Sequence, residues 1–155
     1  HIFGNIFYKC SNGAFGAVQI HGGKENLVKN NIFYNCHAAV SHTSWSEEFW
    51  KRYINPHLVT FEKNRDLYEK RYPEMKRLNE NLNYNTMKNN IVINSIETIL
   101  RKSPSFFANN NFELKTDLRF SNFESLEEVL KKNNRSIKEI IFENIDFNKI
   151  GIRKR

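Results

Sequence analysis

A repeated heptapeptide constrains the fold of this 155-residue chain more than any other feature. Residues 4–10 read GNIFYKC and residues 30–36 read NNIFYNC, so the second copy begins 26 residues after the first. Weaker copies begin at Asn89 and Asn109, and the long gap before Asn89 indicates one insertion into the repeat. Since one short strand cannot bury its apolar face alone, strands that return at this period predict coils stacked on one another, as in a parallel β-solenoid.

Alternating side chains within the aligned copies predict a strand with one buried face. One column holds Ile6, Ile32, Ile91 and Phe112, and a second column holds Tyr8, Tyr34, Ile93 and Leu114. The residues that follow the second column are all polar, namely Lys9, Asn35, Asn94 and Lys115. Because this period of two is typical of a half-buried strand, we expect the two apolar columns to face the core. Phe7, Phe33 and Val92 alternate with them and are expected to point outward, beneath the helices of the insertion.

The chain contains 23 asparagines, and their positions predict the corners between strands. This residue tolerates the left-handed backbone region, and its amide can bond the same residue on the next coil. We therefore expect a corner at each copy of the repeat, marked by Asn5, Asn31, Asn90 and Asn110. A second set of strands follows at residues 17–21 and 38–42, with a tight corner at Gly22 and Gly23. An antiparallel sandwich whose strands match by chance is the alternative fold.

The insertion, over about residues 45–82, carries helical signals. Ser44 and Glu47 have the spacing of a capping box, which predicts that a helix begins at Ser44. That helix should end before Pro56, because the residue that precedes a proline disfavours helical backbone. A second helix follows at the helical spacing of its apolar residues, and Pro73 stops or restarts it.

A last helix, from about Leu126 to Lys132, is predicted by a second capping box formed by Ser125 and Glu128. The alternating tail from Ile137 to Ile152 is expected to cover an open end of the stack, since an uncovered end exposes strand edges. We therefore expect a C-terminal cap over about residues 121–155.

Composition excludes several classes of function. Lys and Arg number 24 against 17 Asp and Glu, a net charge of +7, which permits an acidic partner. No basic stripe with placed aromatic residues occurs, so nucleic-acid binding is not predicted. No apolar run approaches the ~20 residues of a membrane span, and no signal peptide is visible. Cys10 and Cys36 are expected to be buried free thiols. No cofactor is predicted and no metal site, because His37 and His42 lack a third ligand.

Four segments, taken in order along the chain, resemble one family. Residues 17–26 run into the second copy of the repeat, and the likeness continues through residues 71–75, 89–93 and 145–152. Together they resemble the secreted bacterial right-handed parallel β-helix proteins, which are usually classed with polysaccharide lyases or β-helical glycoside hydrolases. The resemblance covers essentially the whole chain. His21 departs from it, because family members tend to have an acidic or amide residue there.

The resemblance implies an all-β fold, namely a right-handed parallel β-helix with a helical insertion, a short C-terminal helix and a capping tail. It implies that residues 1–155 form a single domain, the C-terminal part of a longer protein whose upstream coils stack on it. It also implies a secreted, periplasmic or cell-surface location and a polysaccharide or oligosaccharide partner, neutral or acidic. The implied activity is cleavage of an extracellular polysaccharide by β-elimination or hydrolysis. A non-catalytic glycan-binding or surface-structural β-helix is the alternative.

Elimination on a uronic acid needs a base at the C5 proton of the sugar and a cation near its carboxylate. His21 and His42 end the strands of the second set and are the candidate bases. Both could stand on one outer wall, but a register that matches Val18 to Val40 points His42 inward and His21 outward. For each histidine a structural role at a corner or on the surface is the alternative.

Three further residues could hold the substrate, and a carboxylate could act as an acid. Lys24 and Arg52 are candidate cations for the sugar carboxylate, and the ring of Trp45 could stack on a sugar face. Hydrolysis instead usually needs two carboxylates. Residues 1–46 contain a single one, so Glu47 and Glu48, just beyond, are the candidate acids, with Glu47 the first of them. The alternative role of Glu47 is that of the capping acid of the helix. The aromatic residues at the start of the insertion could equally serve to dock its helices.

Overall fold

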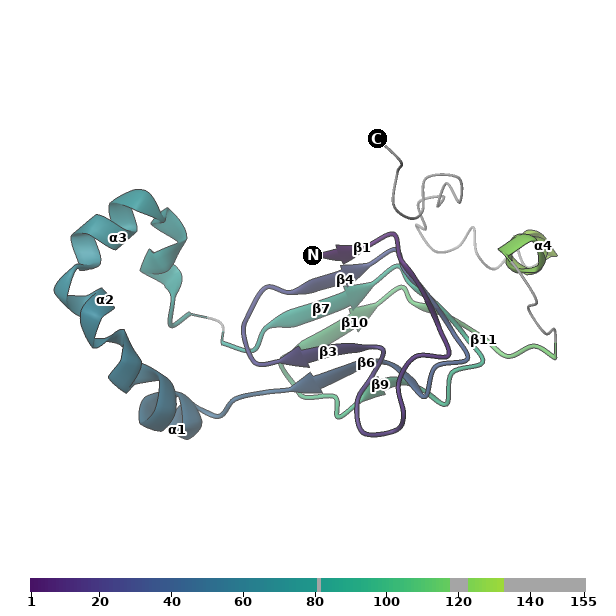
Figure 1. The fold of residues 1–155 in the computed structure, drawn as a ribbon, viewed down its shortest axis with the longest axis horizontal. Helices are drawn as coiled ribbons and strands as arrows, with labels where there is room; N and C mark the ends of the chain where they lie inside the picture. The colour runs from purple at the N-terminus through teal and green to yellow at the C-terminus, as the bar shows by residue number, and fades with distance from the viewer. Residues whose placement is uncertain (81, 118–122, 133–155) are drawn as a thin grey trace.

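The computed structural model describes residues 1–80, 82–117 and 123–132, and it is mainly β, with three parallel sheets and a few helices (Figure 1). Sheet A contains β1 (Ile2–Phe3), β4 (Leu27–Lys29), β7 (Asn85–Lys88) and β10 (Phe106–Asn109). Sheet B contains β2 (Ile6–Tyr8), β5 (Ile32–Tyr34), β8 (Ile91–Ile93) and β11 (Phe112–Leu114). Sheet C contains β3 (Val18–His21), β6 (Ala38–Thr43) and β9 (Glu97–Leu100). Every strand pair in the described residues is parallel, which excludes the antiparallel sandwich.

The register of sheet B confirms the predicted alignment of the four copies. Ile6, Ile32, Ile91 and Phe112 lie in one column, and Tyr8, Tyr34, Ile93 and Leu114 lie in another. The rings of Phe7 and Phe33 stack with their centroids 4.9 Å apart and an interplanar angle of 7°. Equivalent side chains therefore lie next to one another on neighbouring strands, and the repeat is visible in the sequence for this reason.

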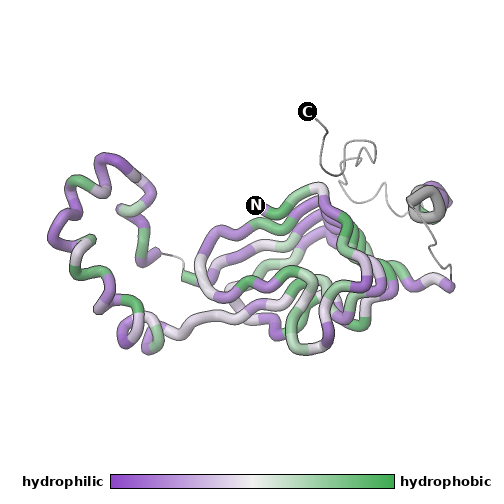
Figure 2. Tube along the Cα trace, viewed as in Figure 1, coloured by the Kyte–Doolittle hydropathy of each residue, from purple (hydrophilic) through white to green (hydrophobic). Residues whose placement is uncertain are grey.

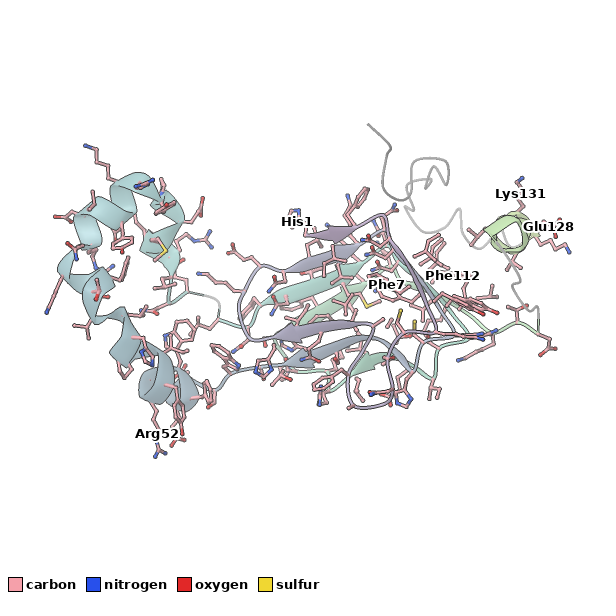
Figure 3. The ribbon with its side chains drawn as sticks, viewed as in Figure 1. His1, Phe7, Arg52, Phe112, Glu128 and Lys131 are labelled. Carbon is pink, nitrogen blue, oxygen red and sulfur yellow. The ribbon has the colours of Figure 1, made fainter. Side chains whose placement is uncertain are left out.

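The prediction for the two faces of sheet B is wrong. The residues expected to point outward, Phe7, Phe33 and Val92, pack in or against the core that the three sheets enclose, as Figure 3 shows for Phe7. Val28 of sheet A and Val40 of sheet C belong to the same core. The Ile and Tyr columns lie on the opposite face of sheet B, where Leu130 packs against them. Because both faces of the two central strands, β5 and β8, are covered, successive positions there are apolar, and alternation does not distinguish the faces.

The corner between sheets A and B uses two adjacent residues where the sequence predicted one. Gly4, Asn30, Asn89 and Asn110 have left-handed backbone, with φ values between 50° and 67°. The residues that follow them, Asn5, Asn31, Asn90 and Asn111, form a ladder in which each amide nitrogen donates to the next amide oxygen over 2.8–3.0 Å. Asn110 therefore forms the turn, and Asn111 takes its predicted place in the ladder. A shift of one residue decides which role each asparagine has.

Helices occupy the segment between β6 and β7, and they stand beside the sheets (Figure 1). They are α1 (Glu47–Phe49), the π-helix η1 (Trp50–Ile54), the 3-10 helix η2 (Asn55–Leu58), α2 (Val59–Lys63), α3 (Arg65–Arg71) and the 3-10 helix η3 (Pro73–Arg77). In Figure 2 hydrophobic residues are scattered among hydrophilic ones along these helices, whereas hydrophobic segments of neighbouring strands lie side by side. The prediction that the helices cover the outside of sheet B is therefore wrong.

The start of the insertion differs from the predicted capping box. Ser46 is the N-cap of α1, and its hydroxyl accepts a hydrogen bond from the backbone N–H of Phe49 at 3.0 Å. The predicted cap at Ser44 is therefore wrong. Pro56 does not end the helical path, because a proline in the first turn of η2 needs no hydrogen bond from its nitrogen. Pro73 separates α3 from η3, as predicted.

The last helix, α4 (Phe123–Lys132), begins earlier than predicted. Ser125 lies inside this helix, so the second capping box is wrong. Leu130 of α4 covers the outer face of sheet B, and Val129 is buried. Of the predicted cap over residues 121–155, the structure describes only this helix. The tail from Ile137 to Ile152 lies outside the described residues.

The two cysteines are free thiols, as predicted, but Cys10 is only partly buried. Cys36 is buried, and its Sγ lies 3.5 Å from the carbonyl oxygen of Phe7 and 3.7 Å from that of Tyr34. Burial raises the pKa of the Cys36 thiol to about 11, so this thiol is protonated at neutral pH. Cys36 is therefore a packing residue of the core and a poor nucleophile.

Candidate functional site

His21 and Trp45 meet where the insertion leaves sheet C. Their rings pack edge to face, with centroids 6.0 Å apart and an interplanar angle of 81°. The indole of Trp45 lies so close to Gly22 that a Cβ on this glycine would stand 2.5 Å from it, and Gly22 has a φ of +73°. Asn83 holds the same segment, because its side chain exchanges hydrogen bonds of 2.6 and 2.8 Å with the backbone of Trp45. Trp45 therefore has a fixed position beside an exposed histidine.

His21 also lines a small recess at the first coil, together with His1 and Ile2. Its volume is about 170 Å³, and its lining includes Gln19, Gly22, Asn26 and Leu27. These residues belong to β3, to β4 and to the turn between them. The exposed His21 thus contacts Trp45 and also borders this recess.

A row of aromatic rings continues from Trp45 along the first helices of the insertion. The ring of Phe49 lies 5.1 Å from that of Trp45, and the ring of Tyr53 lies 4.7 Å from that of Phe49. Phe49 and Tyr53 lie four residues apart on continuous helical backbone and so share one face, whereas Trp45 precedes the N-cap, Ser46. Phe49 is 39% exposed and Tyr53 is 49% exposed. His21, Trp45, Phe49 and Tyr53 are called the aromatic surface below.

The ring of Trp50 also lies beside Trp45, with the two centroids 6.1 Å apart. Its indole nitrogen donates a hydrogen bond of 3.2 Å to the side-chain oxygen of Asn79. Trp50 thereby joins the outgoing and the returning segments of the insertion. Docking of the insertion thus involves Trp45 and Trp50, whereas Phe49 and Tyr53 leave much of their rings open to a ligand.

The two candidate cations have different environments. The ammonium of Lys24 donates to the carbonyl oxygens of Arg77 and Glu80, the latter at 2.9 Å. Lys24 therefore ties the turn after β3 to the end of the insertion. The guanidinium of Arg52 stands 5.5 Å from the ring centre of Tyr53, and its side chain projects from the insertion (Figure 3). Of the two, Arg52 is the cation that accompanies the aromatic surface.

The carboxylates Glu47 and Glu25 are both exposed. Glu47 is exposed in the first turn of α1, where a negative charge is favoured by the helix dipole. Glu25, the single carboxylate of residues 1–46, accepts a hydrogen bond of 3.3 Å from Arg77 at the surface. Glu47 thus stays the candidate acid, and Glu25 has a cationic partner of its own.

His42 is buried on the inner side of sheet C and is only 1% exposed. The register pairs His21 with Thr43, which is the register that points His42 inward and His21 outward. The Nε2 atom of His42 lies 3.2 Å from the amide nitrogen of Asn85, and its Nδ1 atom lies 2.8 Å from Ser103 Oγ. Since the amide nitrogen is a donor, a neutral ring with its proton on Nδ1 satisfies both contacts. His42 is therefore a structural residue that a polymer outside the sheets does not reach.

We expect this buried imidazole to make the protein sensitive to acid. Burial lowers the pKa of His42 below its ordinary value of 6.5. At a pH between the lowered pKa of the folded protein and the ordinary pKa, the unfolded chain binds the proton and the folded chain does not. The contribution of His42 to the free energy of unfolding should therefore be constant above pH 6.5. As the pH decreases below 6.5, the free energy of unfolding should decrease by at most about 1.4 kcal/mol per pH unit for one proton.

Urea unfolding between pH 5 and pH 8 measures this effect. His42→Gln should remove the part of the slope that is due to His42, whereas His57→Gln, at an exposed position, should keep it. Equal slopes in the wild type and in His42→Gln would contradict the prediction.

Sequence reasoning missed two residues of this site, Phe49 and Asn83. The spacing of four between residues 45, 49 and 53 was available as a signal for Phe49. Nothing local marks Asn83, because its partner, Trp45, lies 38 residues away.

Comparison with protein-family models, with curated proteins and with solved structures finds no match to this chain. Within the described ranges, no three side chains of His, Cys, Asp or Glu gather as a metal ion would require. No helix in the described part of the chain has the length and apolar character needed to cross a membrane.

Proposed function

We propose that this chain belongs to a carbohydrate-active protein and that the aromatic surface binds an extracellular polysaccharide. The observation that carries the proposal is the row of rings from Trp45 to Tyr53, two of them well exposed, beside an exposed histidine. Aromatic faces offer a large apolar area with little conformational freedom to lose, which suits the flat apolar faces of sugar rings. Arg52 adds a positive charge next to Tyr53 for a carboxylate on the glycan.

The finer fold that we propose is the C-terminal part of a right-handed parallel β-helix, with upstream coils stacked on β1, β2 and β3. The return of the chain to three parallel sheets supports this, as do the aligned columns and the asparagine ladder. The resemblance in the sequence places such a protein in the secreted, periplasmic or cell-surface space of a bacterium. These parts of the proposal rest on the resemblance.

Cleavage by β-elimination is the reaction that we assign to the site if the protein is an enzyme. His21 would take the C5 proton of a uronic acid, the bond from C4 to the leaving oxygen would break, and a C4–C5 double bond would form. The leaving oxygen takes a proton from water. Arg52 would neutralise the sugar carboxylate, and hydrolysis with Glu47 as the acid is the second reaction to test.

A non-catalytic glycan-binding role is the second candidate function. It is favoured by the burial of His42 and by the hydrogen bonds of Lys24 to backbone carbonyl groups. His21 is therefore the one candidate base, and Arg52 the one candidate cation, that keeps its expected role beside the aromatic row. Binding through the aromatic surface is common to both roles.

Two matched tyrosines test the binding. Tyr53 and Tyr72 are 49% and 52% exposed, both on the insertion, but Tyr72 lies beyond the aromatic row. Tyr53→Ala should weaken retention on a polysaccharide about tenfold, the loss of one aromatic contact. Tyr72→Ala should leave retention unchanged. The measurement is affinity electrophoresis on a panel of acidic and neutral polysaccharides, with circular dichroism to verify folding.

The same panel separates the reactions. New reducing ends together with absorbance of an unsaturated product, both lost in His21→Gln, would establish elimination. New ends without absorbance, lost in Glu47→Gln, would establish hydrolysis. Retention without either product would establish the non-catalytic role. Retention on no polysaccharide, or equal effects of Tyr53→Ala and Tyr72→Ala, would overturn the proposal.

A further inference from the structure

The loop between β2 and β3 (Figure 1) contains a reactive pair of residues, Asn12 and Gly13. Of the 23 asparagines in the chain, Asn12 is the one that a glycine follows. Because glycine has no Cβ, its backbone nitrogen can approach the side-chain carbon of the preceding asparagine closely. Asn12 is exposed, and Gly13 has a φ of +97°, a conformation that glycine adopts readily. The loop therefore presents both groups of an intramolecular reaction at the surface.

The side-chain carbonyl of Asn12 has a backbone donor. The N–H of Ala14 donates to Asn12 Oδ1 at 3.3 Å. When a nucleophile attacks the amide carbon, negative charge develops on this oxygen, and a donor already aimed at the oxygen stabilises that charge. The contact with Ala14 therefore favours attack on the side chain of Asn12.

An imidazole lies beside Gly13. A Cβ built on this glycine would stand 3.4 Å from Cε1 and 3.6 Å from Nε2 of His37. His37 belongs to the next coil, directly before β6, and its side chain is half-buried. A histidine in this place can take the proton of the Gly13 N–H, directly or through one water, and thereby make the nitrogen a better nucleophile.

The loop is fixed to the next coil on both sides of the reactive pair. Ser11 Oγ accepts a hydrogen bond of 3.0 Å from the backbone N–H of His37. The N–H of Gly16 donates to Ser41 Oγ at 2.7 Å. These bonds hold Gly13 beside His37, and a reaction between groups that the fold already holds together has a smaller entropic barrier.

We propose that Asn12 is a site of self-catalysed modification, at which His37 promotes conversion to a succinimide and then to aspartate or isoaspartate. The nitrogen of Gly13 forms a bond to the side-chain carbon of Asn12 while His37 takes the proton of that nitrogen. The bond from the carbon to the amide nitrogen then breaks, and ammonia leaves with the proton that His37 returns. Water opens the succinimide at either carbonyl, which yields aspartate or isoaspartate. This inference is independent of the proposed function.

The conversion changes the charge and the length of the loop. Both products add one negative charge, and isoaspartate also adds a methylene to the main chain. The cover that this loop forms over sheet C is close, because a Cβ on Gly16 would stand 2.5 Å from backbone atoms of β6. Since Ser11 and Gly16 are both bound to the next coil, the longer main chain should strain these bonds. Amide hydrogen exchange at Gly16 should therefore be faster in the isoaspartyl form.

Peptide mapping measures the conversion in the whole chain. After incubation at neutral pH, trypsin releases residues 10–24 as one peptide, and chromatography with mass spectrometry resolves its asparaginyl, aspartyl and isoaspartyl forms. His37→Gln should slow the conversion about tenfold or more, because a positioned general base contributes about 100-fold or more to a rate. His57→Gln removes an exposed histidine of the insertion and should leave the rate unchanged. Circular dichroism verifies that each variant is folded.

Asn94, which Ser95 follows, is the internal control. Its Oδ1 accepts from the N–H of Thr116 at 2.8 Å and its Nδ2 donates to the carbonyl oxygen of Thr116 at 2.7 Å, so this amide should stay intact over the same period.

Unfolding provides a second comparison. In guanidinium chloride the wild type should convert Asn12 more slowly than the folded protein does, since His37 no longer lies beside Gly13. Conversion of Asn12 no faster than that of Asn94, equal rates in the wild type and in His37→Gln, or a higher rate in the unfolded chain would overturn the proposal. None of these results depends on a polysaccharide, so they leave the proposed function untouched.

Discussion

Phe33→Ala should lower the free energy of unfolding by about 3–5 kcal/mol, the range for truncating a fully buried phenylalanine. The side chain of Phe33 is completely buried among residues of all three sheets, including Val28 and Val40. Its ring also stacks on that of Phe7, so alanine would remove a contact within sheet B and leave a cavity between the sheets. Because a domain of this size is stable by about 5–15 kcal/mol in total, the loss should be large.

Urea unfolding followed by circular dichroism measures this loss. Phe107→Ala is the matched control, because Phe107 is 43% exposed on a parallel strand and should contribute less than about 1 kcal/mol. If Phe33→Ala and Phe107→Ala had equal effects, Phe33 would have to point away from the core, as alternation in the sequence predicted.

Asn90→Ala should destabilise the protein by about 2–4 kcal/mol, because it leaves more than one buried polar group without a partner. The side-chain oxygen of Asn90 accepts from the backbone N–H of Asn31 at 2.9 Å, and its amide nitrogen donates to the carbonyl oxygen of Val28 at 3.0 Å. Asn31 and Val28 are themselves fully buried, so water does not replace these bonds.

The first residue of the same ladder provides the control. Asn5 is exposed, and its amide nitrogen donates to the carbonyl oxygen of Phe3 and to Asn31 Oδ1. Asn31 Oδ1 keeps the hydrogen bond of 3.0 Å from the backbone N–H of Asn5, and solvent can reach the carbonyl of Phe3, so the loss should stay below about 1 kcal/mol. Equal losses for Asn90→Ala and Asn5→Ala in urea unfolding would show that the ladder contributes through local turn preference and not through buried hydrogen bonds.

The candidate site was predictable in part. The aromatic residues Trp45 and Tyr53 stand out in the sequence, and the structure brings them together through Phe49, which the sequence reasoning passed over. His21 lies beside Trp45, a contact between β3 and the insertion that no local pattern contains. His42 was a candidate base by its position at a strand end. Whether it faces solvent depends on pairing with β3 and on the buried partner Asn85, 43 residues away.

By itself the sequence determined the strands of sheet B, their alignment and the asparagine corners that precede them, but not the strands of sheet A. Equivalent side chains stack in parallel columns, such as the column from Ile6 to Phe112, so the repeat of the strands appears as a repeat in the sequence. Only the tertiary structure decided which face of sheet B is the core and where the insertion stands. The reason is physical. Alternating hydrophobicity distinguishes the two faces of a strand only when one face is exposed to water, and the central strands of sheet B contact protein on both faces. The packing of three sheets around Phe33 makes one face the core, and the packing of Leu130 covers the other.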